Sequence, residues 1–236
     1  MRRVAIHLHT DYSFDSNFSP EQVVAAARDE GLDTIAITDH NEIEGALRAR
    51  ARGGVRVIVG EEVSTLDGHL IGLFLRERIA PGLSAARTIE QIRDQGGLVF
   101  APHPFATLCN ASLGDALVAL ADRIDAIEVH NAQNPLFWED RRAQRFAAER
   151  SLTAYAGCDT HVRGRLAPAW QEMADFGTPA EFLAALAKAR LVCGRFGPGY
   201  FAAMIHRHVR DAFGWRPVAG YGVSYRRMQA GRVAGA

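Results

Sequence analysis

Histidine is distributed unevenly along this chain of 236 residues, which contains nine histidines. Most of them lie before residue 162, in short polar segments between apolar runs: His7, His9, His40, His69, His103, His130 and His161. Carboxylates such as Asp15, Glu61 and Asp159 occur in the same kind of segment. Imidazole and carboxylate groups suit zinc, manganese or iron, and a catalytic ion commonly keeps about three protein ligands and one open position. These residue types therefore predict binding of divalent metal ions.

The number of candidate ligands predicts more than one ion. The best-placed candidates are His7, His9, Asp15, His40, Glu61, His69, His103, Asp159 and His161. They are too many for a single ion and could serve two or three. A cluster of cations joined by one carboxylate is suited to phosphate-ester hydrolysis, because it generates hydroxide near neutral pH and holds the phosphoryl oxygens.

Short apolar runs alternate with helix-like segments, and these elements would position the ligands. We expect strands at residues 3–8, 34–38, 55–60, 70–75, 98–101, 126–129 and 153–156, and helices at 20–30, 43–52, 84–95, 115–122, 136–150, 179–190 and 200–213. Ser19 and Thr178 each precede a proline and stand three residues before Gln22 and Glu181, which is typical of a capped helix start. The alternation predicts an α/β fold, with seven strands in a closed or nearly closed barrel.

The candidate ligands fall just after strands, where barrel enzymes carry their chemistry. His7 and His9 end the first expected strand, and His103 follows the fifth. Only His69 departs from this rule, because it precedes the fourth strand. We therefore expect the ligands to converge at one mouth of the barrel.

Composition limits the classes of partner. Lys+Arg and Asp+Glu both number 27, so the formal net charge is +0, which makes a large nucleic-acid surface an unfavoured hypothesis. No apolar run approaches the roughly 20 residues that span a bilayer, so no membrane partner is expected. The three cysteines are far apart and odd in number, which indicates a reducing, cytoplasmic location. We expect one domain over residues 1–215, including C-terminal helices, and a flexible tail over 216–236.

Taken in order, these motifs resemble the PHP (polymerase and histidinol phosphatase) superfamily of metal-dependent phosphoesterases. The motifs that carry the resemblance are His7-Leu8-His9-Thr10 with Tyr12-Ser13 and Asp15, Thr38-Asp39-His40, Gly60-Glu61, His69, His103-Pro104 and Asp159-x-His161. The resemblance implies a distorted, TIM-like (β/α)7 barrel with a trinuclear metal centre of Zn, Mn or Fe. By this resemblance His7, His9, Glu61 and Asp159 would hold one ion, Glu61 would bridge to a second ion held by His69 and His103, and Asp15, His40 and His161 would hold a third.

Other residues near these motifs are candidates for catalysis or substrate binding. Asp39 could support the neighbouring ligand or move a proton, and His130 could orient substrate, donate a proton or merely pack. Glu62 is expected to face away from Glu61 on the extended chain and to be structural. Arg163, Arg165 and Arg195 are candidates for binding the outer oxygens of a phosphate group, because guanidinium groups pair with phosphate through two hydrogen bonds.

The function that we expect is hydrolysis of a small phosphorylated metabolite, a phosphomonoester such as histidinol phosphate or a nucleotide monophosphate, by attack of a metal-bound hydroxide. Two alternatives remain open. One is hydrolysis of phosphodiesters in nucleotides or at oligonucleotide ends. The other is a non-catalytic metal-binding module that regulates a partner.

Overall fold

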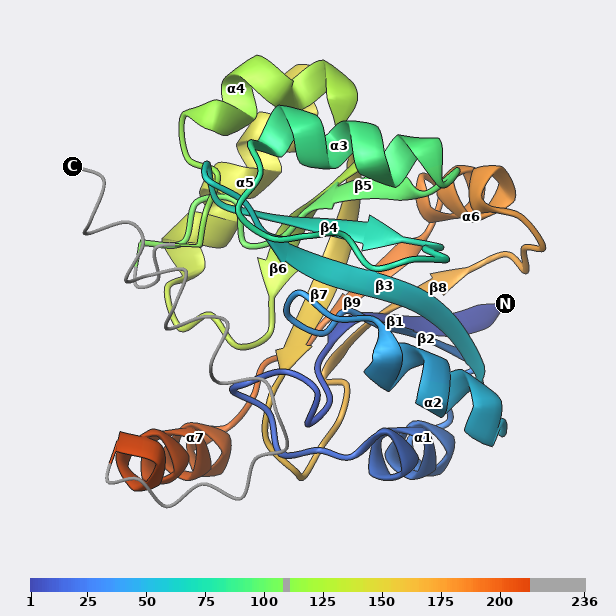
Figure 1. Cartoon of the computed structure of the whole chain (residues 1–236), viewed down its shortest axis with the longest axis vertical. Helices are drawn as coiled ribbons and strands as arrows, with labels where there is room; N and C mark the ends of the chain where they lie inside the picture. Colours follow the sequence, from blue (N-terminus) through green and yellow to red (C-terminus); the bar gives the residue numbers. More distant parts are fainter. Residues whose placement is uncertain (108–110, 213–236) are drawn as a thin grey trace.

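The computed structural model describes residues 1–107 and 111–212 (Figure 1). Its strands are β1 (Arg2–Leu8), β2 (Thr34–Ile37), β3 (Arg56–Ser64), β4 (His69–Leu73), β5 (Leu98–Ala101), β6 (Ala126–Asn131), β7 (Thr153–Thr160), β8 (Ala169–Met173) and β9 (Arg190–Cys193). Its helices are α1 (Pro20–Asp29), α2 (Glu44–Arg52), α3 (Ala85–Asp94), α4 (Ala116–Leu120) with a 3-10 turn at Ala121–Arg123, α5 (Phe137–Arg150), α6 (Pro179–Leu186) and α7 (Pro198–Ala212). The tail expected over 216–236 lies outside the described residues.

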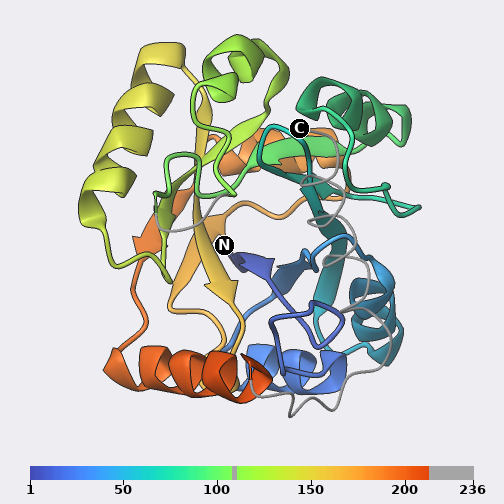
Figure 2. The ribbon, with the colours of Figure 1, turned by 60° about the vertical axis from the view of Figure 1, so that its left-hand side comes forward.

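The first seven strands form a closed barrel. Strand order runs β2-β3-β4-β5-β6-β7-β1, and a further pairing of β1 with β2 closes the ring. Helices surround the strands, as Figure 2 shows. All neighbouring strands are parallel except at β4, which is antiparallel to both β3 and β5. The expected distorted seven-stranded barrel is confirmed.

Two strands, β8 and β9, were not expected from the sequence. β8 runs antiparallel to the first half of β1 and to β9. The buried Gln171 of β8 joins β8 to β1 and β7 through its amide, which accepts from the backbone N–H of Ala156 (2.8 Å) and donates to the carbonyls of Val4 and Ala156 (3.2 and 3.0 Å). This side chain satisfies backbone groups where the ladder branches, and an unpaired buried amide would be costly there.

Alternation along the strands divides the core into two layers. An inner cluster fills the barrel and includes Val4, Ile6, Ala36, Ile58, Ile71, Phe100 and Tyr155, with Phe182 of α6. An outer cluster packs against the helices and includes Ala5, Ile35, Val57, Val59, Leu70, Val99 and Ile127. A residue's place in this alternation therefore decides whether it points into the barrel or toward the helices.

The helix starts follow the capping chemistry expected from the sequence. Ser19 accepts from the backbone N–H of Gln22 while the Gln22 side chain accepts from that of Ser19, and Thr178 and Glu181 form the same reciprocal pair.

Among the described residues, no helix is both long enough and apolar enough to cross a bilayer.

Candidate metal centre

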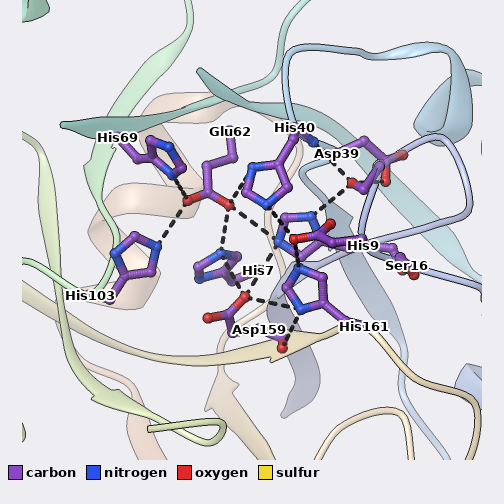
Figure 3. A network of polar contacts seen from close by, with 12 residues as sticks. His7, His9, Ser16, Asp39, His40, Glu62, His69, His103, Asp159 and His161 are labelled. Carbon is purple, nitrogen blue, oxygen red and sulfur yellow. Dashed lines mark hydrogen bonds and ion pairs between the residues drawn. The ribbon is translucent and has the colours of Figure 1, made fainter. Parts of the chain in front are cut away.

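Imidazoles and carboxylates from well-separated strands converge at one end of the barrel (Figure 3). This end is the carboxyl end of the parallel strands. The clustered side chains project from β1, β3 and β7 and from the segments that follow β1, β2 and β5. His69 joins them from the beginning of β4. Because β4 alone runs antiparallel, its first residue lies at the same mouth as the last residues of its neighbours. The exception noted in the sequence is thus a consequence of strand direction.

A bulge in β1 brings two histidines into the barrel. The pairing of β1 with β2 shifts register between Ala5 and Leu8, and His7 has a φ of 69°. Ile6 and His7 consequently both point inward, Leu8 packs outward, and His9 points inward again. Both imidazoles are fully buried.

Glu62 lies at the centre of the cluster. Its Oε1 is 2.7 Å from His69 Nδ1 and 2.9 Å from His103 Nε2. Its Oε2 is 3.1 Å from His7 Nε2 and 3.2 Å from His9 Nε2. Each oxygen of one buried carboxylate therefore faces a different pair of imidazoles, the arrangement that a carboxylate shared by two cations requires.

The expectation that Glu61 is the shared carboxylate, and that Glu62 faces away, is wrong. In β3, Glu62 continues the inward-facing series of Ile58, whereas Glu61 continues the outward-facing series of Val57 and Val59. Glu61 Oε2 accepts a hydrogen bond from the backbone N–H of Ile79 (2.8 Å). Burial raises the pKa of Glu61 to about 8, against the lowering effect of that hydrogen bond.

Asp159, near the end of β7, directs one carboxylate oxygen at the clustered imidazoles and the other at two side-chain amides. Oδ1 lies 3.5 Å from the Nε2 atoms of His7 and His9 and 3.4 Å from His161 Nδ1. Oδ2 accepts from the side-chain amides of Asn131 (3.1 Å) and Gln133 (3.2 Å). The two amides leave Oδ1 directed at the imidazoles.

A third group forms beside these residues. Asp15 Oδ2 lies 3.3 Å from His40 Nε2 and 3.3 Å from His161 Nε2. His9 and His161 stack with ring centroids 4.1 Å apart, and the ring of Phe14 stacks on His40 at 5.2 Å. Of the expected ligands, the structure brings all but Glu61 together.

The donor atoms of this cluster fit divalent cations. Four overlapping groups each have their ligand atoms within 4.8 Å of one another: His7 with Glu62 and His103, His7 with His9 and Asp159, His40 with Glu62 and His69, and His9 with His40 and His161. Several of the atoms are buried and make no well-formed hydrogen bond within the described chain: His9 Nε2, Asp15 Oδ1, His40 Nδ1, His103 Nδ1 and His161 Nε2. Buried polar atoms normally find a partner, so an ion would satisfy these atoms.

The protonation of the ligand atoms without metal is uneven. Burial lowers the pKa of His40, but Asp15 and Glu62 outweigh it and raise that pKa to about 9. Nearby carboxylates likewise raise the pKa of His7, His103 and His161 against burial.

His9 and Glu62 are held in their metal-binding forms. Burial, together with nearby His161 and His40, lowers the pKa of His9 to about 3. For Glu62 burial acts in the opposite sense, but the neighbouring imidazoles, His40 first, outweigh it and hold the pKa well below its usual range. A neutral imidazole and an ionised carboxylate are the forms that bind metal.

Asp39 supports the cluster from outside it. Its carboxylate accepts from the hydroxyls of Thr10 (2.6 Å) and Ser13 (2.8 Å), and the Ser13 hydroxyl lies 3.0 Å from His9 Nδ1. The same hydroxyl accepts from the backbone N–H of His40 (3.0 Å). Burial raises the pKa of Asp39 to about 6, against these hydrogen bonds. Asp39 and Ser13 thus fix the orientation of His9 and leave its Nε2 for the cluster.

Glu128 performs a similar task for His7. Its Oε1 lies 2.9 Å from His7 Nδ1, and its Oε2 accepts from the backbone N–H of His103 (2.6 Å). Glu128 is not among the candidate site residues named from the sequence. Its inward position, two residues after the inward-facing Ala126 of β6, is a signal that the sequence contained.

The structure does not place His130 at the cluster. Pairing of β6 with β7 shifts register between Glu128 and His130, which turns His130 outward toward α5. There its Nδ1 lies 3.1 Å from Asp140 Oδ2 and its Nε2 lies 2.8 Å from the carbonyl of Gly194. His130 joins elements of the barrel wall, so packing is the role that its contacts support.

The three arginine candidates also lie elsewhere. Arg195 pairs with Asp140 and donates to the carbonyls of Asn131 and Asn134. Arg163 is exposed and donates to the carbonyl of Asn17 (2.9 Å). Arg165 lines a surface pocket with Arg3, Glu30 and Trp170 that contains none of the cluster residues. Arg195 and Arg163 thus donate to other parts of the protein, and Arg165 lies at a pocket away from the cluster.

Comparison with known proteins agrees with the motifs. The sequence model of the PHP domain matches residues 5–80, and that of a PHP-associated region matches 138–191. An uncharacterized protein of Methanocaldococcus jannaschii, MJ1587, is 41% identical over 140 residues, which cover 54% of this chain and 80% of that protein. The chain belongs to the PHP domain family.

Two further matches place this PHP protein among others. A two-domain protein from Bacteroides vulgatus, described as containing a predicted PHP-like metal-dependent phosphoesterase, shares the fold with a TM-score of 0.67 and 17% identity, over 87% of this chain and 69% of that one. The phosphoribosyl 1,2-cyclic phosphate 1,2-diphosphodiesterase of Eggerthella lenta is 36% identical over 89 residues, which cover 34% of this chain and 33% of that protein.

Proposed function

We propose that this PHP protein is a metal-dependent phosphoesterase that hydrolyses the phosphomonoester of a small metabolite, such as histidinol phosphate or a nucleotide monophosphate. The observation that carries the proposal is Glu62, a buried carboxylate whose two oxygens face different pairs of imidazoles. Membership of the family supports the reaction class, and the absence of net charge favours a small substrate over a polyanion.

The proposed ligand sets are those that the PHP resemblance implies, with Glu62 in place of Glu61. His7, His9, Glu62 and Asp159 would hold one ion, His69 and His103 would hold a second that shares Glu62, and Asp15, His40 and His161 would hold a third. Zinc, manganese and iron all suit such donors. When bound, these ions would supply an activated water and neutralise charge on the phosphoryl oxygens.

The chain's own residues prepare this site before any substrate arrives. Ser13 orients His9 and Glu128 orients His7, so each imidazole presents its Nε2 to the same centre. Asp39 is occupied by Thr10 and Ser13, so it acts through His9 and not on substrate. Preorganised ligands lower the reorganisation needed during the reaction.

Phosphodiester hydrolysis is the second candidate, and one observation favours it. The relative from Eggerthella lenta, which matches part of this chain, is named for cleavage of a cyclic phosphodiester. A diester has one phosphoryl oxygen fewer for cations to hold, and it places a second ester group at the mouth. Hydrolysis of a diester panel in preference to monoesters would establish this candidate instead.

The test is an ester-hydrolysis assay on purified protein loaded separately with Mn²⁺, Zn²⁺ or Fe²⁺, and it follows phosphate released from monoesters, p-nitrophenol released from an aryl diester and shortened products from an oligonucleotide. The substrates are a panel of phosphomonoesters, bis(p-nitrophenyl) phosphate and a short single-stranded oligonucleotide. We expect release from one or more monoesters that a chelator abolishes and added metal restores. Full metal content with no turnover of any ester would contradict the proposal and would favour a non-catalytic metal-binding module.

A further inference from the structure

A tyrosine from outside the barrel contacts the backbone that carries two candidate ligands. Tyr200 lies in the first turn of α7, which follows the barrel in sequence and sits beyond the end of β7 (Figure 1). Its hydroxyl accepts from the backbone N–H of His161 (2.9 Å) and lies 3.3 Å from the carbonyl of Asp159. One phenol therefore contacts the chain on both sides of Thr160.

The same hydroxyl also orients Gln133, whose side chain donates a hydrogen bond to Asp159. Tyr200 donates to Oε1 of Gln133 (2.9 Å), and Nε2 of Gln133 donates to Asp159 Oδ2 (3.2 Å). An amide has one accepting and one donating end, so a donor placed at Oε1 keeps Nε2 pointed at the carboxylate. Without the phenol, the Gln133 amide could rotate and bring its oxygen to Asp159, and the Asp159 carboxylate would repel that oxygen.

Asp159 needs this support. Its φ is 54°, in the left-handed region that non-glycine residues rarely adopt, and such a conformation persists only where surrounding contacts enforce it. Asn131 makes one of those contacts, and the path from Tyr200 through Gln133 makes another. The phenol ring itself is anchored by stacking on Phe196, with centroids 3.7 Å apart and planes at 10°.

We infer that Tyr200 is a positioning residue of the metal centre, acting through Gln133 and the backbone of residues 159–161 to aim Asp159 Oδ1 and His161 at bound metal. Helix α7 is then part of the functional unit, although neither matched family region includes it. The inference rests on the proposed metal-dependent function, because it assigns a role toward the same ions.

Tyr200→Phe tests the inference, because it keeps the stacked ring and removes only the hydroxyl. We would titrate metal-free protein with Co²⁺, record its ligand-field absorption bands, and measure Zn²⁺ affinity by competition with a chromophoric chelator. We expect the variant to bind either ion roughly 10- to 100-fold more weakly, with altered Co²⁺ bands. The His161 N–H loses its partner in this variant, so the unfolding midpoint without metal should fall by only about 2–4 °C.

Two further variants sharpen the result. Tyr12→Phe is the matched control, since its hydroxyl accepts from Arg48 at the surface (2.8 Å), and we expect wild-type affinity and spectrum. Gln133→Leu should weaken binding as Tyr200→Phe does, and the double variant should be little worse than either, because the two residues act in one chain of contacts.

Unchanged affinity and bands in Tyr200→Phe would overturn the inference while leaving the phosphoesterase proposal intact. An equal loss in Tyr12→Phe would overturn it as well, because the effect would then not depend on the path to Asp159. Failure of the wild-type protein itself to bind Co²⁺ or Zn²⁺ would remove the proposed function and this inference together.

Discussion

Replacing each of the two adjacent glutamates of β3 by glutamine should give opposite results. Glu62 faces five imidazoles, of which His69 is nearest at 2.7 Å and His40 farthest at 3.5 Å. Glutamine keeps the shape of the side chain but loses the charge and one of the two oxygens. Glu62→Gln therefore removes the carboxylate that we propose two cations share.

The magnitude follows from these contacts. Loss of residues that merely orient ligands commonly weakens metal binding 10- to 100-fold, so loss of a shared ligand should exceed about 100-fold and remove at least one ion. Removal of one partner from a buried charged cluster costs about 3 kcal/mol. For a chain of this size that free-energy change lowers the unfolding midpoint of the metal-free protein by roughly 6–12 °C.

Glu61→Gln is the matched control, one residue away on the same strand. Glu61 contacts the backbone of Ile79, and glutamine retains an oxygen that can accept this hydrogen bond. Elemental analysis, Zn²⁺ competition and phosphate release should therefore match wild type. Loss of metal in Glu61→Gln with normal metal content in Glu62→Gln would refute the assignment of Glu62 as the shared ligand.

Three further predictions follow from the surroundings of the cluster. The pKa of Glu61 is raised to about 8 in the folded state, from 4.5, so its stabilising effect is complete below pH 4.5 and is lost as pH rises through 8. With chelator present, the unfolding midpoint of Glu61→Gln should therefore fall less than that of wild type between pH 6 and pH 9. Equal falls in the two proteins would contradict this prediction. Ser13→Ala should weaken Zn²⁺ binding roughly 10- to 100-fold by freeing the His9 ring, whereas Ser84→Ala at the start of α3 should alter stability alone. Arg195→Ala should lower the free energy of unfolding by about 1–3 kcal/mol through its half-exposed pair with Asp140, and a rise in KM at unchanged stability would instead place Arg195 at the substrate.

The sequence predicted the barrel because its strands and helices carry strong local signals. Apolar runs bounded by Gly, Pro and capping residues located the seven barrel strands and the starts of α1 and α6. β8 and β9 carry weaker signals, because Gln171 and Glu172 interrupt the apolar pattern of β8 and β9 is only four residues long. Gln171 is buried to satisfy backbone groups of other strands, a tertiary requirement that local pattern does not contain.

The choice between Glu61 and Glu62 failed for a related reason. β3 is apolar on both faces from Val57 to Val59, so its pattern gives no phase from which to count inward and outward positions. A one-residue change of phase moves every side chain to the other face of a strand. The position of His69 fixes this phase. His69 pairs with Ser64 in the β3–β4 ladder, and its Nδ1 lies 2.7 Å from Glu62 Oε1, so Glu62 lies on the same face as His69.

Bulges explain the remaining differences, and they also show why the site could not follow from alternation alone. β1 is irregular at His7, β6 is irregular between Glu128 and His130, and Asp159 lies one residue before the end of β7. His7 and Asp159 both have a positive φ. In β1 the bulge turns a ligand into the barrel, and in β6 it turns a histidine out of it. Neither residue is a glycine, so the sequence carries no local mark of the bulge. Such backbone conformations are held by the contacts of neighbouring strands and collect at functional sites, and at His7 and Asp159 they direct two candidate ligands into this cluster.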